Sequence, residues 1–308
     1  MRSLVKSISP LLAITCLTAA NAASAKDDPE IVVLKPSSPW NLDMGEHKCR
    51  IARLFGEGEN QTIFVIDQWD PSKTAQWTVA GPALEKYRNG RDTGFEFSEG
   101  GDAGEFELLG SFFGEFGNAI QYSSGFVADE EEASEEGEEP DYVANPRSLP
   151  ELDAKGASAI EWLTISQRGR TPVRLHLGAL DAPLSAMNVC MENLVEFWGF
   201  DIAEQRTVAS PPEVTNMKNV AREVAEQYPN AALNRGAQAD FHIRLTIDTQ
   251  GEIENCVLLN QTAAEDFELG GHPCTAFERY AKIEPARDAA GQPVRTYLTN
   301  RIVYRMGR

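Results

Sequence analysis

Short apolar or alternating segments, separated by turn residues, recur through the first part of the chain. Alternation with a period of two and short apolar runs are both typical of sheet strands. The pattern therefore predicts a β-rich region whose strands lie at residues 31–34, 49–55, 61–68, 76–80, 159–166 and 173–177.

A helical period replaces this alternation at residues 184–198, and Gly199 marks its end. Cys190 lies on the same side of this predicted helix as its apolar residues. We expect a mostly β domain closed by this one helix, with Cys190 reaching back to Cys49 on an early strand. The apolar residues at helical spacing are Leu184, Met187, Met191 and Leu194.

Two adjacent prolines, Pro211 and Pro212, divide the chain. Paired prolines stop regular structure and stiffen a linker. We therefore predict a linker at residues 208–213, between an acidic β-rich domain at 26–207 and a smaller domain at 214–308.

The smaller domain shows a clear succession of periods. One strand alternates fully, with Phe241, Ile243, Leu245 and Ile247 on one face and His242, Arg244 and Thr246 on the other. A tight turn at 249–251 leads to a returning strand in which Ile253 and Val257 face inward. The order is helix, strand, strand, helix, strand, which with the first domain makes the fold class α+β. The predicted ranges are 219–227, 240–248, 252–260, 273–282 and 293–304.

Acidic residues dominate the composition, with 47 Asp and Glu against 28 Lys and Arg, a formal charge of −19. Such a field repels polyanions and argues against nucleic acid as a partner. Nine of the acids lie in residues 129–141, which predicts a disordered acidic loop at about 127–142. We expect this loop to lie within a long mobile region over about 99–152.

The first 25 residues have the layout of a secretory signal. Arg2 and Lys6 precede an apolar stretch, and small residues lead to a cleavage pattern that ends at Ala25. The apolar stretch is shorter than the roughly 20 residues that span a bilayer. We expect cleavage and export to the periplasm, and the alternative is an uncleaved inner-membrane anchor. Cleavage removes two positive charges, so the mature charge is −21.

Four cysteines remain after this cleavage: Cys49, Cys190, Cys256 and Cys274. In an exported chain they predict two disulfides, for which three connectivities are possible.

The order and spacing of short motifs in the smaller domain resemble those of the TonB C-terminal domain over residues 211–308. The matching features are Tyr228-Pro229 followed by Ala231 and Ala232, Ile-Asp-x-x-Gly at 247–251, Ile-Glu-Pro-Ala at 283–286, Gly-Gln-Pro-Val at 291–294, and the closing Ile-Val-Tyr at 302–304. The larger N-terminal domain resembles no family that we identify.

This resemblance implies a non-catalytic module that binds a protein or peptide partner by strand addition, such as an outer-membrane receptor. It also implies a Cys256–Cys274 disulfide, which closes a loop of about 18 residues and contributes roughly 3 kcal/mol. By analogy, the docking edge is the final strand, with Thr296, Leu298, Asn300, Ile302 and Tyr304.

The chain also departs from the family pattern, because an acidic domain replaces the membrane helix and the long proline-rich linker. One alternative is therefore an anchored TonB-type energy transducer for transmembrane transport. Another is a hydrolase whose site lies in the N-terminal domain.

Motifs that would indicate catalysis or cofactors are weak. The triplet at residues 92–94 matches aspartic proteases, but it follows a polar turn and not a buried apolar strand. We interpret His176 and His242 as residues on exposed strand faces. The spacing of the histidines and cysteines predicts no metal site, and no cofactor is expected.

Overall fold

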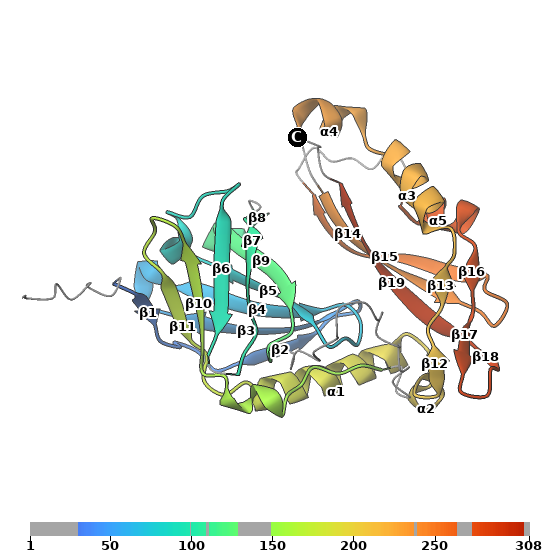
Figure 1. The fold of residues 1–308 in the computed structure, drawn as a ribbon, viewed down its shortest axis with the longest axis horizontal. Coiled ribbons are helices and arrows are strands. Elements are labelled where there is room, and N and C mark those ends of the chain that lie inside the picture. The colour runs from blue at the N-terminus through green and yellow to red at the C-terminus, as the bar shows by residue number, and fades with distance from the viewer. Residues whose placement is uncertain are drawn as a thin grey trace, which may run out of the picture.

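The computed structural model describes residues 30–98, 100–108, 111–128, 149–236, 239–263 and 273–304. The predicted signal segment at 1–25 and most of the predicted acidic loop, 129–142, lie outside these residues. Figure 1 shows an N-terminal region of two sheets above one long helix, and a C-terminal region of one main sheet with helices on one side. The α+β fold class is confirmed.

The N-terminal region contains two sheets. The first has the order β2-β3-β4-β5-β9-β8: β2 (Asn41–Met44), β3 (Cys49–Phe55), β4 (Thr62–Gln68), β5 (Ala75–Ala80), β9 (Asn118–Ser124) and β8 (Ser111–Phe112). The second has the order β1-β11-β10-β6-β7: β1 (Val32–Leu34), β11 (Val173–His176), β10 (Trp162–Gln167), β6 (Asp92–Phe97) and β7 (Ala103–Glu107). Only the β1–β11 pair is parallel among these. Short 3-10 turns lie at Gly58–Asn60, Pro82–Leu84, Gly114–Phe116 and Gly156–Ala159.

The two sheets share one hydrophobic core. Trp77 on β5 is fully buried, and its ring lies 5.4 Å from that of Phe95 and 6.3 Å from that of Phe97, both on β6 of the other sheet. Edge-to-face aromatic contacts of this kind add to the stabilisation from apolar burial. The alternating residues of β5 and β6 therefore hold the sheets together.

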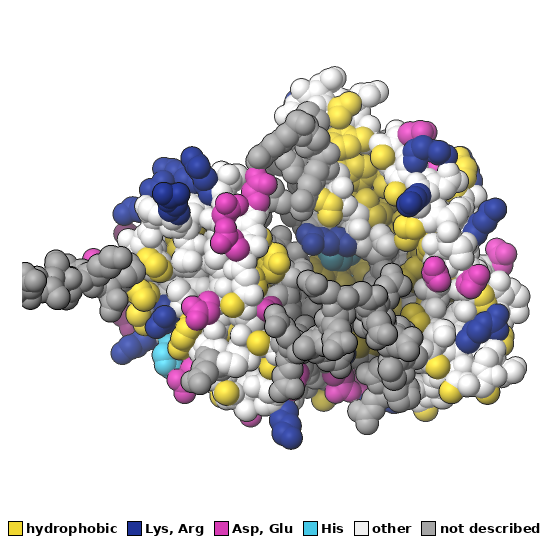
Figure 2. All heavy atoms as spheres, viewed as in Figure 1, with side chains coloured by type: hydrophobic (Ala, Val, Ile, Leu, Met, Phe, Trp, Pro, Cys, Tyr) yellow, Lys and Arg dark blue, Asp and Glu magenta, His cyan; other side chains and the backbone are white. Residues whose placement is uncertain are grey.

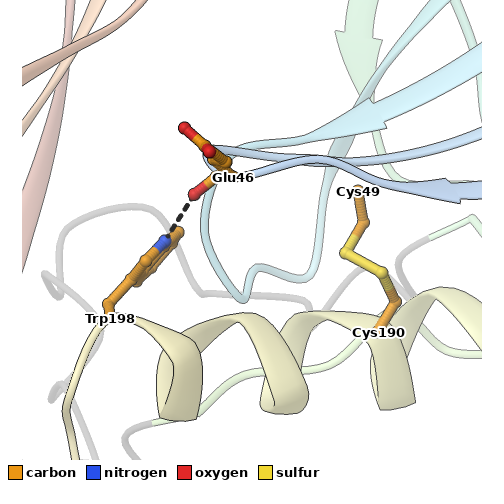
Figure 3. Close-up of a disulfide and its surroundings, with 4 residues drawn as sticks. All are labelled: Glu46, Cys49, Cys190 and Trp198. Carbon is orange, nitrogen blue, oxygen red and sulfur yellow. Dashed lines mark hydrogen bonds between the residues drawn. A yellow bond between two sulfur atoms is a disulfide. The ribbon is translucent and has the colours of Figure 1, made fainter.

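The helix α1 (Asp181–Phe197) closes the N-terminal region as predicted, and the apolar face identified in the sequence enters the core. The predicted Cys49–Cys190 disulfide joins it to β3, with the Cα atoms 6.2 Å apart. Figure 3 shows a second attachment, in which the indole Nε1 of Trp198 donates to the carbonyl oxygen of Glu46 at 3.0 Å. Gly199 follows with a left-handed φ of 85°, which ends the helix.

The predicted mobile loop over 99–152 is wrong for residues 103–107, 111–112 and 118–124, which form β7, β8 and β9. The strand β9 pairs with β5 along six residues and buries Ile120. Tyr122 of β9 stacks on Phe106 of β7 with ring centroids 4.5 Å apart. Glycines and acids between these few apolar residues hide the strand pattern, and the strands are fixed by pairing with distant partners.

The C-terminal region has the predicted order of elements. Its main sheet has the order β15-β14-β19, all antiparallel, and α3 and α5 pack on one face of it. The side chains of Phe241, Ile243, Leu245 and Ile247 are all fully buried in that core. The elements are α3 (Met217–Glu226), α4 (Asn230–Arg235), β14 (Ala239–Ile247), β15 (Ile253–Ala263), α5 (Pro273–Tyr280) and β19 (Thr296–Tyr304).

The residues predicted as a linker are attached to the C-terminal region. After the short α2 (Ile202–Gln205), β12 (Val208–Ser210) pairs with β17 (Ala286–Asp288), and β13 (Glu213–Val214) pairs with β16 (Ile283–Glu284). Pro211 and Pro212 separate the two strands, as their ring geometry requires. The predicted final strand is also interrupted at Arg295, which separates β18 (Pro293–Val294) from β19.

The prediction that Val257 faces the core is wrong. The register between β14 and β15 shifts twice, at Glu254 and at Leu259, so that each bulge places one extra residue in β15. A bulge reverses the alternation of faces along a strand. Cys256 and Leu258 therefore pack against the core in its place.

Candidate functional site

The strand β19 lies at one edge of the C-terminal sheet. It pairs with β14 in an unbroken antiparallel register, from Ile247 opposite Thr296 to Ala239 opposite Tyr304. Within the part of the chain that the structure describes, β14 is its only strand neighbour. The other edge of β19 is thus placed to accept an added strand through main-chain hydrogen bonds.

The five residues predicted for the docking edge share one face of β19, because side chains alternate along a strand. That face is turned toward the α3 and α5 side, where Thr296, Ile302 and Tyr304 are buried and Leu298 is partly buried. Asn300 is half-buried. These side chains fix the position of the strand, so docking at this edge would use main-chain atoms.

Tyr304 fastens the end of β19 to the helices. Its hydroxyl donates to the Val224 carbonyl oxygen of α3 at 3.0 Å, and its ring meets Tyr228 edge-on with centroids 5.1 Å apart. Burial raises the pKa of Tyr304 to about 12, so the hydroxyl remains a donor at neutral pH. Tyr228, part of the Tyr-Pro pair quoted for the family resemblance, therefore has a packing role.

The opposite face of the sheet is covered by the N-terminal region, and the interpretation of His242 as exposed is wrong. Trp69, just after β4, stacks on His242 with ring centroids 4.1 Å apart. Its neighbour Asp70 accepts a hydrogen bond from the Thr299 hydroxyl at 2.6 Å. Sequence alternation identifies the two faces of a strand but not what packs against the polar one.

The end of α1 covers the same face further along the sheet. Tyr297 lies 5.5 Å from Trp198 and 5.3 Å from Phe200, measured between ring centroids. The Arg244 guanidinium lies 3.8 Å from the Trp198 ring, a cation–π contact. Burial lowers the pKa of Arg244 to about 10, and burial also raises the pKa of Tyr297 and of Asp70.

A buried glutamine clamps the start of β19. Gln205 of α2 donates through Nε2 to the Arg295 carbonyl oxygen at 2.8 Å and accepts from the Thr296 hydroxyl at 2.6 Å. The beginning of β19 is therefore held by the segment that follows α1. Residues 298–304 are the part of the edge beyond this clamp.

Sequence reasoning missed the residues that join the two regions. None lies in a recognisable motif. The only sequence signal for a contact between the regions was the size and charge of His242 and Arg244 on the polar face of a strand. The residues missed are Trp69, Asp70, Trp198, Phe200 and Gln205.

The Cys256–Cys274 disulfide links β15 to α5, with the Cα atoms 5.7 Å apart. It lies on the helix side of the sheet, where Cys274 is buried. The bond therefore holds the strand at the far edge from β19 against the helix layer.

The described residues form neither the aspartic-protease site nor the metal site considered from the sequence. Asp92 is an exposed residue at the start of β6, which is not the buried strand tip that an aspartic protease needs. Across the described ranges, no three His, Cys, Asp or Glu side chains are grouped to hold a metal ion. No helix in these ranges has both the length and the apolar character to cross a membrane.

Comparison with known protein families gives a match in the C-terminal region. Residues 224–306 match the family model for the Gram-negative bacterial TonB protein C-terminal. A TonB C-terminal domain therefore occupies this range, and the N-terminal region is unassigned. No curated protein and no solved structure matches the chain.

Proposed function

We propose that this chain is an exported, non-catalytic protein-binding module, whose β19 edge accepts an extended segment of an outer-membrane receptor. The observation that carries the proposal is the one-sided pairing of β19, among the described residues, within a TonB C-terminal domain. A strand edge of this kind supplies affinity through main-chain hydrogen bonds.

Two features support the proposed location. The TonB C-terminal domain indicates the cell envelope of a Gram-negative bacterium. The two disulfides are typical of proteins outside the cytoplasm, where thiols are oxidised. Both support the periplasm as the place of action.

The N-terminal region would set how the docking edge is presented. It covers the outer face of the sheet through Trp69 and Trp198, and it clamps the start of β19 through Gln205. A partner strand would then pair along residues 298–304, where Val303 projects outward with 39% of its surface exposed. The role of this region is to hold and orient the sheet.

Site-specific photo-cross-linking in cells tests the proposal. A photoreactive residue replaces Val303, and a matched variant carries it at the exposed Asn255 on β15, the opposite edge strand. We expect a cross-link from position 303 to an outer-membrane receptor, identified by mass spectrometry, and none from position 255. Equal cross-linking from both edges, or none from β19, would contradict docking at β19.

A further inference from the structure

Four arginines gather at one end of the N-terminal region, away from the C-terminal sheet. Arg88 and Arg91 lie in the loop before β6, and Arg168 and Arg170 lie in the turn between β10 and β11. Figure 2 shows a group of Lys and Arg side chains at this end of the molecule. Three of the four are exposed and Arg170 is half-buried.

The two arginine loops are fastened to each other by a buried side chain. Gln167 accepts from the backbone N–H of Arg88 at 2.8 Å, and its Nε2 donates to the Arg88 carbonyl oxygen at 2.9 Å and to the Thr93 hydroxyl at 2.9 Å. The Tyr87 hydroxyl donates to the Ile165 carbonyl oxygen at 2.8 Å. The relative position of the loops is therefore set before any ligand binds.

Between the loops lies an open hollow of about 870 Å³, lined by the four arginines together with Asn89, Asp92, Gln167 and Gly169. Among the described residues, none of the four guanidinium groups has a carboxylate oxygen within 4.0 Å. The hollow thus concentrates guanidinium groups that are not neutralised by those residues.

The local charge opposes that of the chain. Residues 86–92 and 167–170 hold five cations and one acid, whereas the whole chain carries −19. Clustered guanidinium groups bind phosphate oxygens through paired, charge-assisted hydrogen bonds. The four arginines present more hydrogen-bond donors than a carboxylate ligand would need.

We propose that this hollow binds a phosphate group, carried by a soluble phosphate ester or by a phospholipid headgroup. A smaller cavity of about 170 Å³ adjoins it, shares Arg88 and Asn89, and is lined partly by the apolar residues Leu84, Leu108 and Ile120. This second cavity would receive an uncharged part of the same ligand. The arginine hollow is separate from the β19 edge, so the two sites are independent.

Binding assays on the full mature chain test this. The probes are inorganic phosphate and glycerol phosphate by calorimetry, and vesicles of phosphatidylglycerol in phosphatidylcholine by co-sedimentation. The variant R88Q/R91Q/R168Q/R170Q removes the cluster, and a variant with four lysines at these positions keeps the charge without the bidentate geometry. The matched control K218Q/R279Q removes exposed cations from the C-terminal region.

We expect the glutamine variant to bind at least about tenfold more weakly, the lysine variant to be intermediate, and the control to match the parent chain. Binding of the soluble phosphates supports an ester as ligand, and binding of the vesicles alone supports a headgroup. Absence of binding to every probe, or an equal loss in K218Q/R279Q, overturns the proposal. All variants change surface residues, and unchanged urea unfolding confirms that they fold.

Discussion

Trp69 lies flat on His242, with the ring planes inclined by 10°, so that a loop of the N-terminal region covers the outer face of the C-terminal sheet. Trp69 is 5% exposed. Trp69→Ala should lower the free energy of unfolding by about 2 to 4 kcal/mol, because it removes this aromatic contact and leaves a cavity. Urea denaturation measures the change.

Phe112→Ala is the matched control for this substitution, because Phe112 is an aromatic residue with 70% of its surface exposed. It should change stability by less than about 0.5 kcal/mol. Equal effects of the two substitutions would show that the Trp69 contact does not join the regions.

Asp70 should make stability depend on pH. Burial raises its pKa above the ordinary 3.8, while the Thr299 hydrogen bond opposes the shift. Its contribution is fully present below the ordinary value and is lost as pH rises through the folded pKa, because the buried carboxyl must then ionise. Asp70→Asn cannot ionise, so its stability relative to the parent chain should increase from pH 4 to pH 7. A difference that stays constant across this range would contradict the prediction.

The two disulfides should differ in how much they add to the free energy of unfolding. Cys49–Cys190 spans 141 residues and Cys256–Cys274 spans 18. Cross-links that close longer loops restrict the unfolded chain more, so C49A/C190A should cost about 4 to 5 kcal/mol and C256A/C274A about 3 kcal/mol. Urea unfolding of each pair variant measures this. Thiol counting on the denatured, unreduced parent chain should find no free thiol among these four, and four free thiols would refute both bonds and export.

Gly251 should tolerate no side chain. It holds a φ of 85° in the turn between β14 and β15, and a Cβ there would collide with the Ile283 carbonyl oxygen. Gly251→Ala should cost more than about 2 kcal/mol. Gly236 is the control, since its φ of 68° is similar but, among the described residues outside its own helix and chain neighbours, no atom lies within 4 Å of its Cβ position. Gly236→Ala should cost only about 1 kcal/mol, and similar thermal shifts for both would contradict the collision.

The mature protein should begin at Lys26. Cleavage after Ala25 follows from the layout of the first 25 residues. Intact-mass spectrometry of the periplasmic fraction should therefore find a chain without residues 1–25. A full-length mass in the membrane fraction would instead support an anchored transducer.

The sequence predicts the order of elements in the C-terminal region well, because β14 alternates strictly and the turns carry glycine and proline at the required positions. The two bulges of β15 leave no such signal in the sequence, and the faces of that strand were therefore predicted only in part. The Cys190 position was also predictable, since it lies on the apolar face of a regular helix. Strand β9 was missed because its pairing with β5, not its own apolar content, holds it in place. The packing of the N-terminal region on the outer face of the C-terminal sheet was missed for a related reason. The contact between Trp69 and His242 joins residues far apart in the chain.

The two attachments of α1 have a consequence for how load would pass through the molecule. Cys190 and Trp198 lie two helical turns apart, and both fasten α1 to the β2–β3 hairpin, so the helix acts as a rigid strut (Figure 3). At the C-terminal end of α1, Trp198 contacts Tyr297, close to the start of β19. A force exerted by a strand bound at β19 would thus be transmitted through Tyr297 to the cross-linked N-terminal region. Reduction of the disulfide that holds α1 would make this region easier to deform.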